Sequence, residues 1–401
     1  MICNRDLKNI ILVLFLPFQF QFLHDFYLQA LVNVRDKSAD FKVSSSLLEA
    51  ANRVFFVAGT VTSVISVFIY YKIKKRRLFL SINFIINAVV WLAYLGFNEK
   101  RFWLAIVLRI FNGITCAIFH TISISYLFSF IYNIYVGFYG YLIQAGMFLS
   151  LALVYLFFSF FDFKVVAIIF TIQDLLLACL IFFLPEVQAP SKQVTREYVF
   201  APHNLRNLFI NIMLMVFQQF TGINIVLRKI PMMLEGIGLN MKSTLQYFFM
   251  DTVGFLSNFI CAFASVLIPR KIMWCFSSLG LCTSLIIFSL TLLTDKVASW
   301  IGTLGAFLFY MFYGFGMGPI PWYFGGELYN DSLRIEAGAT CFITNMVFTI
   351  VYEYLEEIIL KKFKDLGSVI FCAAFCVLSF FFGLYFIPIP KYREYRNDNI
   401  M

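Results

Sequence analysis

Five primary amides stand inside long apolar stretches of this 401-residue chain, namely Gln144, Gln218, Gln219, Asn224 and Asn345. A primary amide both donates and accepts hydrogen bonds, so a set of them suits a neutral ligand that carries several hydroxyl groups. Each amide could instead hydrogen-bond a neighbouring helix in an apolar environment. Their occurrence on three separate stretches at overlapping depths favours a shared binding site.

Two ionisable residues, Asp25 and Arg109, also lie within apolar stretches. Each is about seven residues from the same side, which at 1.5 Å per residue places both roughly 10 Å below the surface. Pairing is the cheapest way to keep such charges in a bilayer. The pair is either a structural lock or a protonatable carboxylate coupled to the guanidinium, as proton relays require. Three further polar residues are interpreted as helix-packing residues: His120, Asp174 and Asp251.

The apolar stretches dominate the chain, of which 61% is hydrophobic and 13% charged. Soluble domains carry about 45–50% apolar and about 25% charged residues, so a soluble enzyme and a disordered chain are excluded. A membrane-spanning helix needs roughly 20 apolar residues. The sequence predicts an all-α membrane protein with twelve such helices, at 9–32, 51–71, 78–97, 102–130, 134–160, 164–185, 205–228, 243–269, 272–294, 298–329, 334–358 and 366–388.

The chain divides into two parts of similar length. We predict an N-terminal six-helix half at 1–185, a short cytoplasmic linker at 186–204 and a C-terminal six-helix half at 205–401. Basic residues at 72–77 in the first half are matched by IPRK at 268–271 in the second. Such an arrangement is typical of transporters built from parallel repeats.

The basic residues indicate an orientation. Five of the six residues at 72–77 are Lys or Arg, and short connections rich in these residues face the cytoplasm. Both termini are then predicted to be cytoplasmic, and the first stretch is interpreted as a membrane helix rather than a removed signal. The net charge of +9 is ascribed to anchoring at lipid headgroups, not to nucleic acid. The nine cysteines form no C-x-x-C pair, so neither a metal nor a redox site is expected.

The amides at 218–224 require an irregular helix. At 100° per residue, Gln218, Gln219 and Asn224 point in three directions around a straight helix, so they share one cavity only if the helix bends or unwinds. Thr221 and Gly222 mark the place where this is expected. Broken helices are typical of substrate sites in transporters.

A second break is predicted at 315–327, where FGMGPIPWYFGGE holds two prolines and clustered glycines. Such a break frees backbone carbonyls that only a cavity or neighbouring helices can satisfy. Gly318 and Trp322 are four residues apart and share a helix face. An aromatic plate beside a small residue is suited to the floor of a sugar site, although a single Trp more often serves helix packing.

These motifs carry a family resemblance. With QQFTGIN at 218–224 and GPIPWYFGGELYNDSLR at 318–334, the chain resembles the sugar porter family of the major facilitator superfamily. The family pattern is QQ-x-[ST]-GIN in span seven and GP-x-x-W with a following Glu and Arg in span ten. The residues that match the second pattern and the Asn beyond it are Gly318, Pro319, Trp322, Glu327, Arg334 and Asn345.

The first half matches more loosely. Arg109 and Gly113 resemble the Arg and following Gly of span four, and Gln144 falls where a span-five Gln contacts sugar. LPEVQAP at 184–190 keeps the Pro and Glu of the signature after span six, the latter being Glu186. Asp25 falls where symporters of the family have an Asp that pairs with the span-four Arg, whereas facilitative carriers have a neutral residue there.

The departures concern the gates. The family's D-R-x-G-R-R is KIKKRR at 72–77, and its Glu after span four is Ser129. The resemblance assigns Glu186, Glu327 and Arg334 to cytoplasmic gating, and the lost partners imply that the cytoplasmic side closes less firmly.

On the outer side, the Tyr pair that follows the family's Asn is replaced by Arg228 and Lys229. Either the outer gate works differently, or a cationic mouth attracts an anionic solute such as a sugar phosphate.

The resemblance implies a carrier that moves a monosaccharide, specifically a hexose, by alternating access, with proton coupling as a hypothesis. An uncoupled facilitative carrier, a carrier of an anionic sugar derivative and a non-transporting sugar sensor remain as alternatives. An enzyme is not expected, because no set of catalytic groups converges at one depth. The expected partners are the sugar, a proton and the lipid bilayer, without cofactor, metal or nucleic acid, for a monomer in the plasma membrane.

Overall fold

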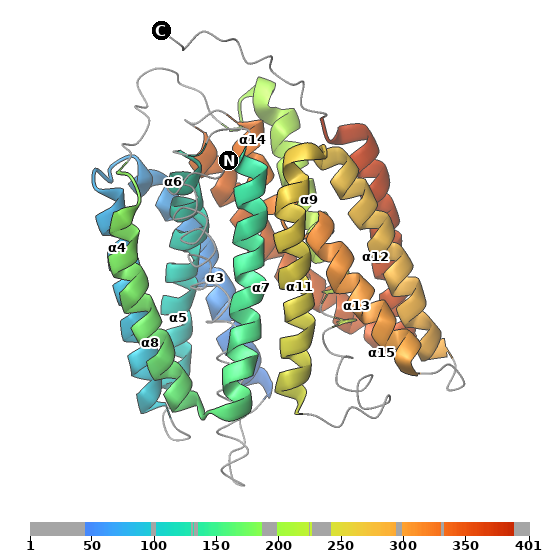
Figure 1. Ribbon diagram of the computed structural model, residues 1–401, viewed down its shortest axis with the longest axis horizontal. Coiled ribbons are helices and arrows are strands. Elements are labelled where there is room, and N and C mark those ends of the chain that lie inside the picture. Colours follow the sequence, from blue (N-terminus) through green and yellow to red (C-terminus); the bar gives the residue numbers. More distant parts are fainter. Residues whose placement is uncertain are drawn as a thin grey trace.

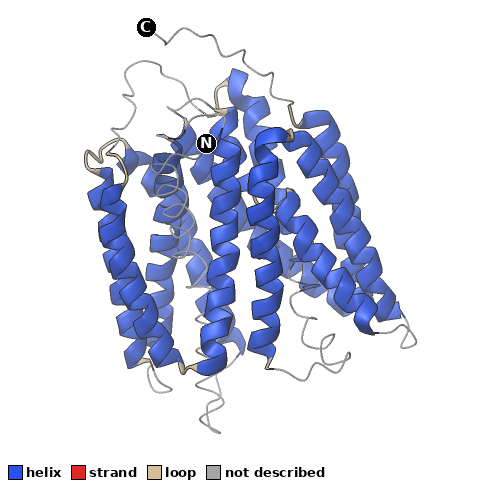
Figure 2. Cartoon of the chain, viewed as in Figure 1, coloured by secondary structure: helices blue, strands red, loops and turns tan. Residues whose placement is uncertain are grey.

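The computed structural model describes residues 45–97, 102–129, 131, 135–186, 199–223, 225–226, 242–293, 299–329 and 333–388. Within these residues all regular secondary structure is helical (Figure 2). This agrees with the apolar composition, because a backbone in lipid must satisfy its own polar groups and a helix does so within one segment. The long helices lie side by side in one bundle (Figure 1).

The N-terminal half consists of α3 (Ser45–Tyr70), α4 (Arg76–Ala93), α5 (Phe102–Ile118), α6 (Ile124–Phe128), α7 (Val136–Phe160) and α8 (Phe163–Leu180). A π-helical turn, η3 (Phe119–Ser123), joins α5 to α6, and the short 3-10 helices η1 (Tyr94–Gly96) and η5 (Ile181–Phe183) extend α4 and α8. The C-terminal half begins with η6 (Pro202–Asn204) and contains α9 (Leu205–Gln219), α11 (Ser243–Leu267), α12 (Arg270–Leu293), α13 (Ser299–Phe315), α14 (Ile320–Leu328) and α15 (Arg334–Phe386).

Most of the predicted spans agree with these helices to within a few residues, but α3 begins before the predicted start at 51 and α9 ends well before the predicted end at 228. Nine segments of the described chain are long and apolar enough to cross a membrane. The longest, α15, has a non-helical residue at Lys364 (φ 56°), which separates the two spans predicted at 334–358 and 366–388. The fifteen-residue α9 corresponds to the span predicted at 205–228. The first predicted span, 9–32, lies outside the described residues.

Both predicted helix breaks are present. Helix α9 ends at Gln219, and Gly222 adopts φ +91°, a left-handed conformation that side chains other than hydrogen strongly disfavour. Helix α13 ends at Phe315, and a turn at 316–319 separates it from α14. The π-helical turn η3 was not indicated by the sequence.

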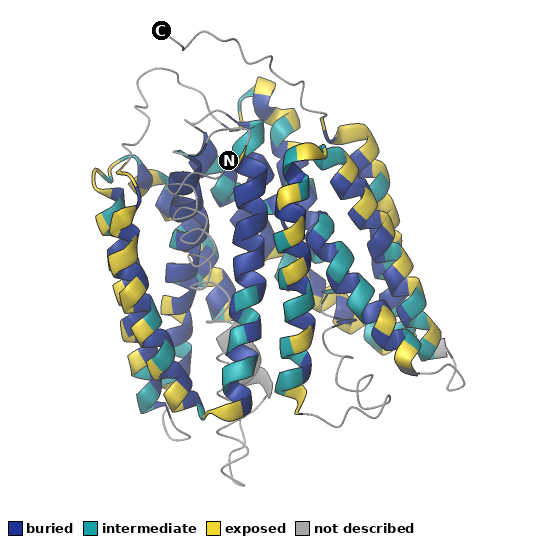
Figure 3. Ribbon diagram, in the orientation of Figure 1, coloured by how far each residue is buried: buried dark blue, intermediate teal, exposed yellow. Residues whose placement is uncertain are grey.

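The two halves meet along their central helices. Helix α7 packs along α11 (Figure 1) and also contacts α14, and α3 packs against α15. Helix α7 is buried over most of its length, whereas α4, α8 and α12 present exposed apolar residues on their outer faces (Figure 3). Outward apolar faces are what a bilayer requires, so polar groups at membrane depth are expected in the interior of the bundle.

Close helix packing also explains one glycine of the family pattern. A Cβ atom built on Gly113 of α5 would lie 2.5 Å from the backbone oxygen of Phe55 in α3. No side chain larger than hydrogen fits there without moving α3 away from α5.

Candidate binding site

The turn between α13 and α14 is held by side chains from other helices. Gln218 of α9 donates from Nε2 to the backbone oxygens of Gly318 (2.6 Å) and Met317 (3.2 Å). Tyr141 of α7 donates to the oxygen of Phe315, the last residue of α13, at 2.6 Å. These carbonyls have lost their helical partners at the break, so the amide and the phenol replace hydrogen bonds that the bilayer cannot supply.

Three of the amides found in the sequence come together around this turn. Asn345 of α15 donates from Nδ2 to Oε1 of Gln218 at 3.3 Å. One turn further along α15, Thr349 donates to Oε1 of Gln219 at 3.0 Å. Gln218 and Asn345 are 3% and 6% exposed. The structure therefore joins Gln218, Gln219 and Asn345 to Gly318 in one network that spans α9, the α13–α14 turn and α15.

Gln144 stands in the opposite half, on α7, and is buried. Its Oε1 atom has no hydrogen-bond partner among the described residues. A buried amide oxygen without a partner costs about 1–3 kcal/mol, which a hydroxyl donor from a ligand would remove. Gln144 and the α9–α15 amides thus face the interior from both halves.

Trp322 of α14 is half-buried and lies between the halves. Its ring centroid is 4.6 Å from that of His120 in η3, and the His120 ring stacks on Phe342 of α15 at 5.2 Å. His120 was interpreted from the sequence as a packing residue, and it does pack, but against the Trp of the candidate site. The π-helical turn that carries His120 is a type of irregularity often found at functional sites.

Arg109 of α5 is fully buried, and its guanidinium carbon lies 4.5 Å from the centroid of the Phe55 ring. A cation over an aromatic face is stabilised electrostatically when it is shielded from water. Its predicted partner, Asp25, lies outside the described residues, as do Asn224, Arg228 and Lys229.

One ion pair within each half lies at the predicted cytoplasmic end, where α4 and α12 begin. Glu327 of α14 accepts from both Nη2 (2.7 Å) and Nε of Arg270 at the start of α12. In the other half, Glu186 accepts from Nε of Arg77 at 2.9 Å and from the backbone nitrogen of Arg76. The bidentate Arg270–Glu327 contact has the geometry that guanidinium and carboxylate prefer.

Hydrogen bonds between the halves close the same end. Arg334 donates from Nη1 to the backbone oxygen of Phe128 at 2.7 Å, which joins α15 to α6. Tyr71 donates to both carboxylate oxygens of Glu336, at 2.8 and 3.0 Å, which joins the α3–α4 connection to α15. Burial and the neighbouring Glu336 raise the pKa of Tyr71, so its phenol remains a donor throughout the physiological range.

The Tyr71–Glu336 contact was not indicated by the sequence, although Tyr71 directly precedes the position where the family's Asp is replaced by Lys72. The weaker cytoplasmic closure expected from that loss stays a prediction, and Tyr71 and Glu336 supply a link in the same region.

A small hollow between the halves lies next to Trp322 and Arg334, lined also by Ser125 and Cys341.

A family model described as "Sugar (and other) transporter" matches residues 187–397, which is 211 of the 401 residues. The chain belongs to this family. The match takes in α9 to α15, and therefore the two breaks and the amide network.

Relatives and solved structures extend the comparison. A facilitated trehalose transporter of Apis mellifera ligustica is 27% identical over 201 residues, 49% of this chain and 40% of that protein. Hexose transporter 1 of Plasmodium yoelii yoelii is 27% identical over 182 residues, 44% of this chain and 36% of its own length. The chain thus matches less than half the length of these curated relatives.

The solved structure of the proton:xylose symporter XylE, bound to 6-bromo-6-deoxy-D-glucose, matches with a TM-score of 0.77 at 15% identity and covers 96% of both chains. The fold of this sugar transporter family member is therefore the major facilitator fold, and the protein is a multi-pass membrane protein. The family and the fold are those of transporters, which are not enzymes.

Proposed function

We propose that this family member carries a neutral sugar across the membrane by alternating access. The observation that carries the proposal is the amide network of Gln218, Gln219 and Asn345 at two helix breaks, opposite Gln144 on the other half. Amides that bind one another in the empty carrier can exchange those bonds for sugar hydroxyls at little cost, because each amide donates and accepts.

The halves, 1–185 and 205–401 with the linker 186–204, would rock about this site. The breaks at 220–222 and 316–319 divide the seventh and tenth spans, so that the part of each helix on one side of the site can move without the other. The contacts of Arg334 with Phe128 and of Tyr71 with Glu336 would have to part when the predicted cytoplasmic end opens. Glu186 and Glu327 would keep each half rigid during this motion.

We propose a monosaccharide, specifically a hexose, as the substrate. The relatives are described as transporters of trehalose and of hexose, and the fold is shared with a proton:xylose symporter. Asn224, Gly318 and Trp322 complete the proposed site by their place in the family pattern. The proposed setting is a monomer in the plasma membrane, with both termini in the cytoplasm.

Uptake of labelled glucose into proteoliposomes tests this function, with unlabelled hexoses, pentoses, trehalose, sugar phosphates and nucleosides as competitors. We expect saturable uptake that hexoses inhibit at the lowest concentration. Inhibition by sugar phosphates at lower concentrations would replace the neutral-sugar proposal with an anionic substrate, recognised by Arg228 and Lys229. Saturable glucose binding without uptake would favour a sensor.

Proton coupling is a second element of the proposed function, favoured by the burial of Arg109 at membrane depth. With a more acidic exterior, we expect the wild-type carrier to accumulate sugar several-fold above equilibrium. Asp25→Asn should abolish accumulation and retain exchange of internal for external sugar, because the neutral side chain mimics a permanently protonated one. The exposed Glu357, replaced by Gln, is the control. Intact accumulation in Asp25→Asn would identify the carrier as an uncoupled facilitator.

A further inference from the structure

An aromatic side chain from α7 occupies the place of a side chain on α11. Phe148 is buried, and a Cβ atom built on Gly254 would lie 2.6 Å and 2.7 Å from two of its ring atoms. Such distances are far below ordinary van der Waals contact, so the ring fits only because residue 254 is a glycine. The contact between Phe148 and Gly254 therefore joins α7 of the N-terminal half to α11 of the C-terminal half.

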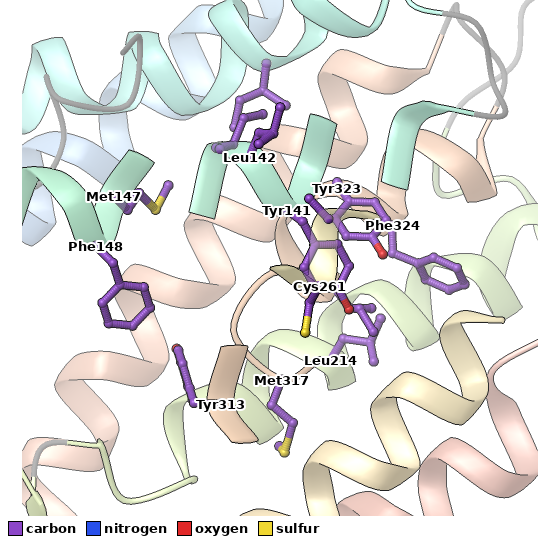
Figure 4. Close-up of a cluster of buried hydrophobic side chains, with 14 of the residues drawn as sticks. Tyr141, Leu142, Met147, Phe148, Leu214, Cys261, Tyr313, Met317, Tyr323 and Phe324 are labelled. Atoms are coloured by element: carbon purple, nitrogen blue, oxygen red, sulfur yellow. The ribbon is translucent and has the colours of Figure 1, made fainter. Parts of the chain in front are cut away.

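The same ring lies beside the amide site. Phe148 follows Gln144 by four residues, so both side chains project from one face of α7. Its centroid is 6.1 Å from that of Tyr313 in a T-shaped arrangement, and 5.9 Å from that of Tyr310. Figure 4 shows Phe148 and Tyr313 next to each other, on helices of opposite halves.

Tyr313 leads directly to the amide network. A Cβ atom on Gly318 would lie 2.7 Å from the Tyr313 ring, and the backbone oxygen of Gly318 accepts a hydrogen bond from Nε2 of Gln218 at 2.6 Å. Gln144, Phe148, Tyr313, Gly318 and Gln218 therefore form one series of neighbouring residues that leads from α7 to α9. Its middle is aromatic and its two ends are amides.

We propose that Phe148, seated on Gly254 and against Tyr313, forms a wall that limits the site to a single sugar ring and excludes disaccharides. This inference rests on the proposed function and names its substrate size. An aromatic wall offers an apolar face to the C–H groups of one pyranose, while the amides on either side bind its hydroxyls. A second ring would need the space that the phenyl ring fills, and a phenyl ring is close to a pyranose in size.

Reciprocal substitutions test the wall. Phe148→Ala empties a space next to the amides, whereas Gly254→Ala adds a methyl group that must push the Phe148 ring toward Tyr313 and Gly318. In the double variant the added methyl group meets no ring, so the effects of the two changes should not add. Phe158→Ala is a matched control, because Phe158 is another buried phenylalanine of α7 and belongs to a different apolar cluster.

The measurement is inhibition of labelled glucose uptake into proteoliposomes by trehalose and by unlabelled glucose. It is expressed as the inhibition constant of trehalose divided by that of glucose. Wild-type and Phe158→Ala carriers should show a high ratio. We expect Phe148→Ala to lower this ratio tenfold or more. We expect Gly254→Ala to weaken the binding of glucose as well as that of trehalose. The double variant should regain glucose binding relative to Gly254→Ala.

Four results separate the ways in which these experiments can fail. A wild-type carrier that takes up trehalose as well as glucose would contradict the proposed role of Phe148. An unchanged ratio in Phe148→Ala would contradict it as well. If Phe148→Ala does not fold, as judged by its elution and melting in detergent, Phe148→Leu gives the same test with a smaller change. A folded wild-type carrier that binds no sugar of any size would instead refute the proposed function.

Discussion

Gln218→Ala is expected to weaken sugar binding about 10- to 100-fold, the largest effect of any single amide in the site. The side chain donates to Gly318 and Met317 and accepts from Asn345, so its loss removes a ligand group and frees two carbonyls at the helix break. A buried polar group without its partner costs about 1–3 kcal/mol, and 1.4 kcal/mol is a factor of ten in affinity. Equilibrium binding of labelled glucose to the purified carrier measures the effect.

Asn211→Ala is the control for this prediction. Asn211 is a buried amide two turns earlier on α9, and it donates to the backbone oxygen of Ala337 in α15 at 3.1 Å. It therefore joins the same two helices as Gln218 and lies away from the α13–α14 turn. We expect this variant to lower the melting temperature and to leave glucose affinity within about threefold of wild type. Equal losses of affinity in both variants would show that Gln218 acts only through helix packing.

Glu327→Gln is expected to destabilise the folded carrier more than any other single carboxylate change at the predicted cytoplasmic end. The Arg270 and Glu327 side chains are only 11% and 16% exposed, so the change leaves a nearly buried guanidinium without its counter-charge. Removing one partner of such a pair costs about 3–5 kcal/mol, and the retained amide oxygen places this variant near the lower limit. The melting temperature in detergent, followed by loss of monodisperse protein, measures the effect.

Two other ion pairs form a graded control series. Arg77 and Glu186 are each 29% exposed, and Lys361 and Glu357 are 72% and 61% exposed. Solvent screens exposed pairs, so Glu186→Gln should have a smaller effect than Glu327→Gln, and Glu357→Gln should have none that is measurable. A melting temperature for Glu327→Gln equal to that of Glu357→Gln would contradict the role given to the Arg270–Glu327 pair.

Local physical rules made the spans and their interruptions predictable. A run of about 20 apolar residues must become a helix if it is to cross a bilayer, so the presence of the spans followed from hydrophobicity, and their approximate limits from the charged and turn residues that bound them. Gly222 and the prolines at 319 and 321 predicted breaks because backbone freedom and missing donors act within a few residues. The candidate amides were found for the same reason. A polar residue in an apolar stretch is recognised from its own segment, without knowledge of the residue that it contacts.

The partners of these groups depended on contacts between distant residues. Gln218 meets Gly318 a hundred positions away, His120 meets Trp322 from the other half, and Phe148 fits over Gly254. No local pattern reports such pairs, because whether two side chains meet depends on helix rotation and on the distance between helix axes. The same holds for the link between Tyr71 and Glu336, whose residues are unremarkable in their own segments.

The sequence thus determined that the chain is a helical membrane protein, where its helices break, and which polar residues stand at membrane depth. Only the tertiary structure decided which of those residues bind one another, that the Phe148 ring packs over Gly254, and which contacts join the halves. The physical reason is the range of the forces involved. Hydrophobic burial and backbone geometry are set residue by residue, whereas a hydrogen bond requires two atoms to lie within about 3 Å, a condition that packing of the whole bundle imposes.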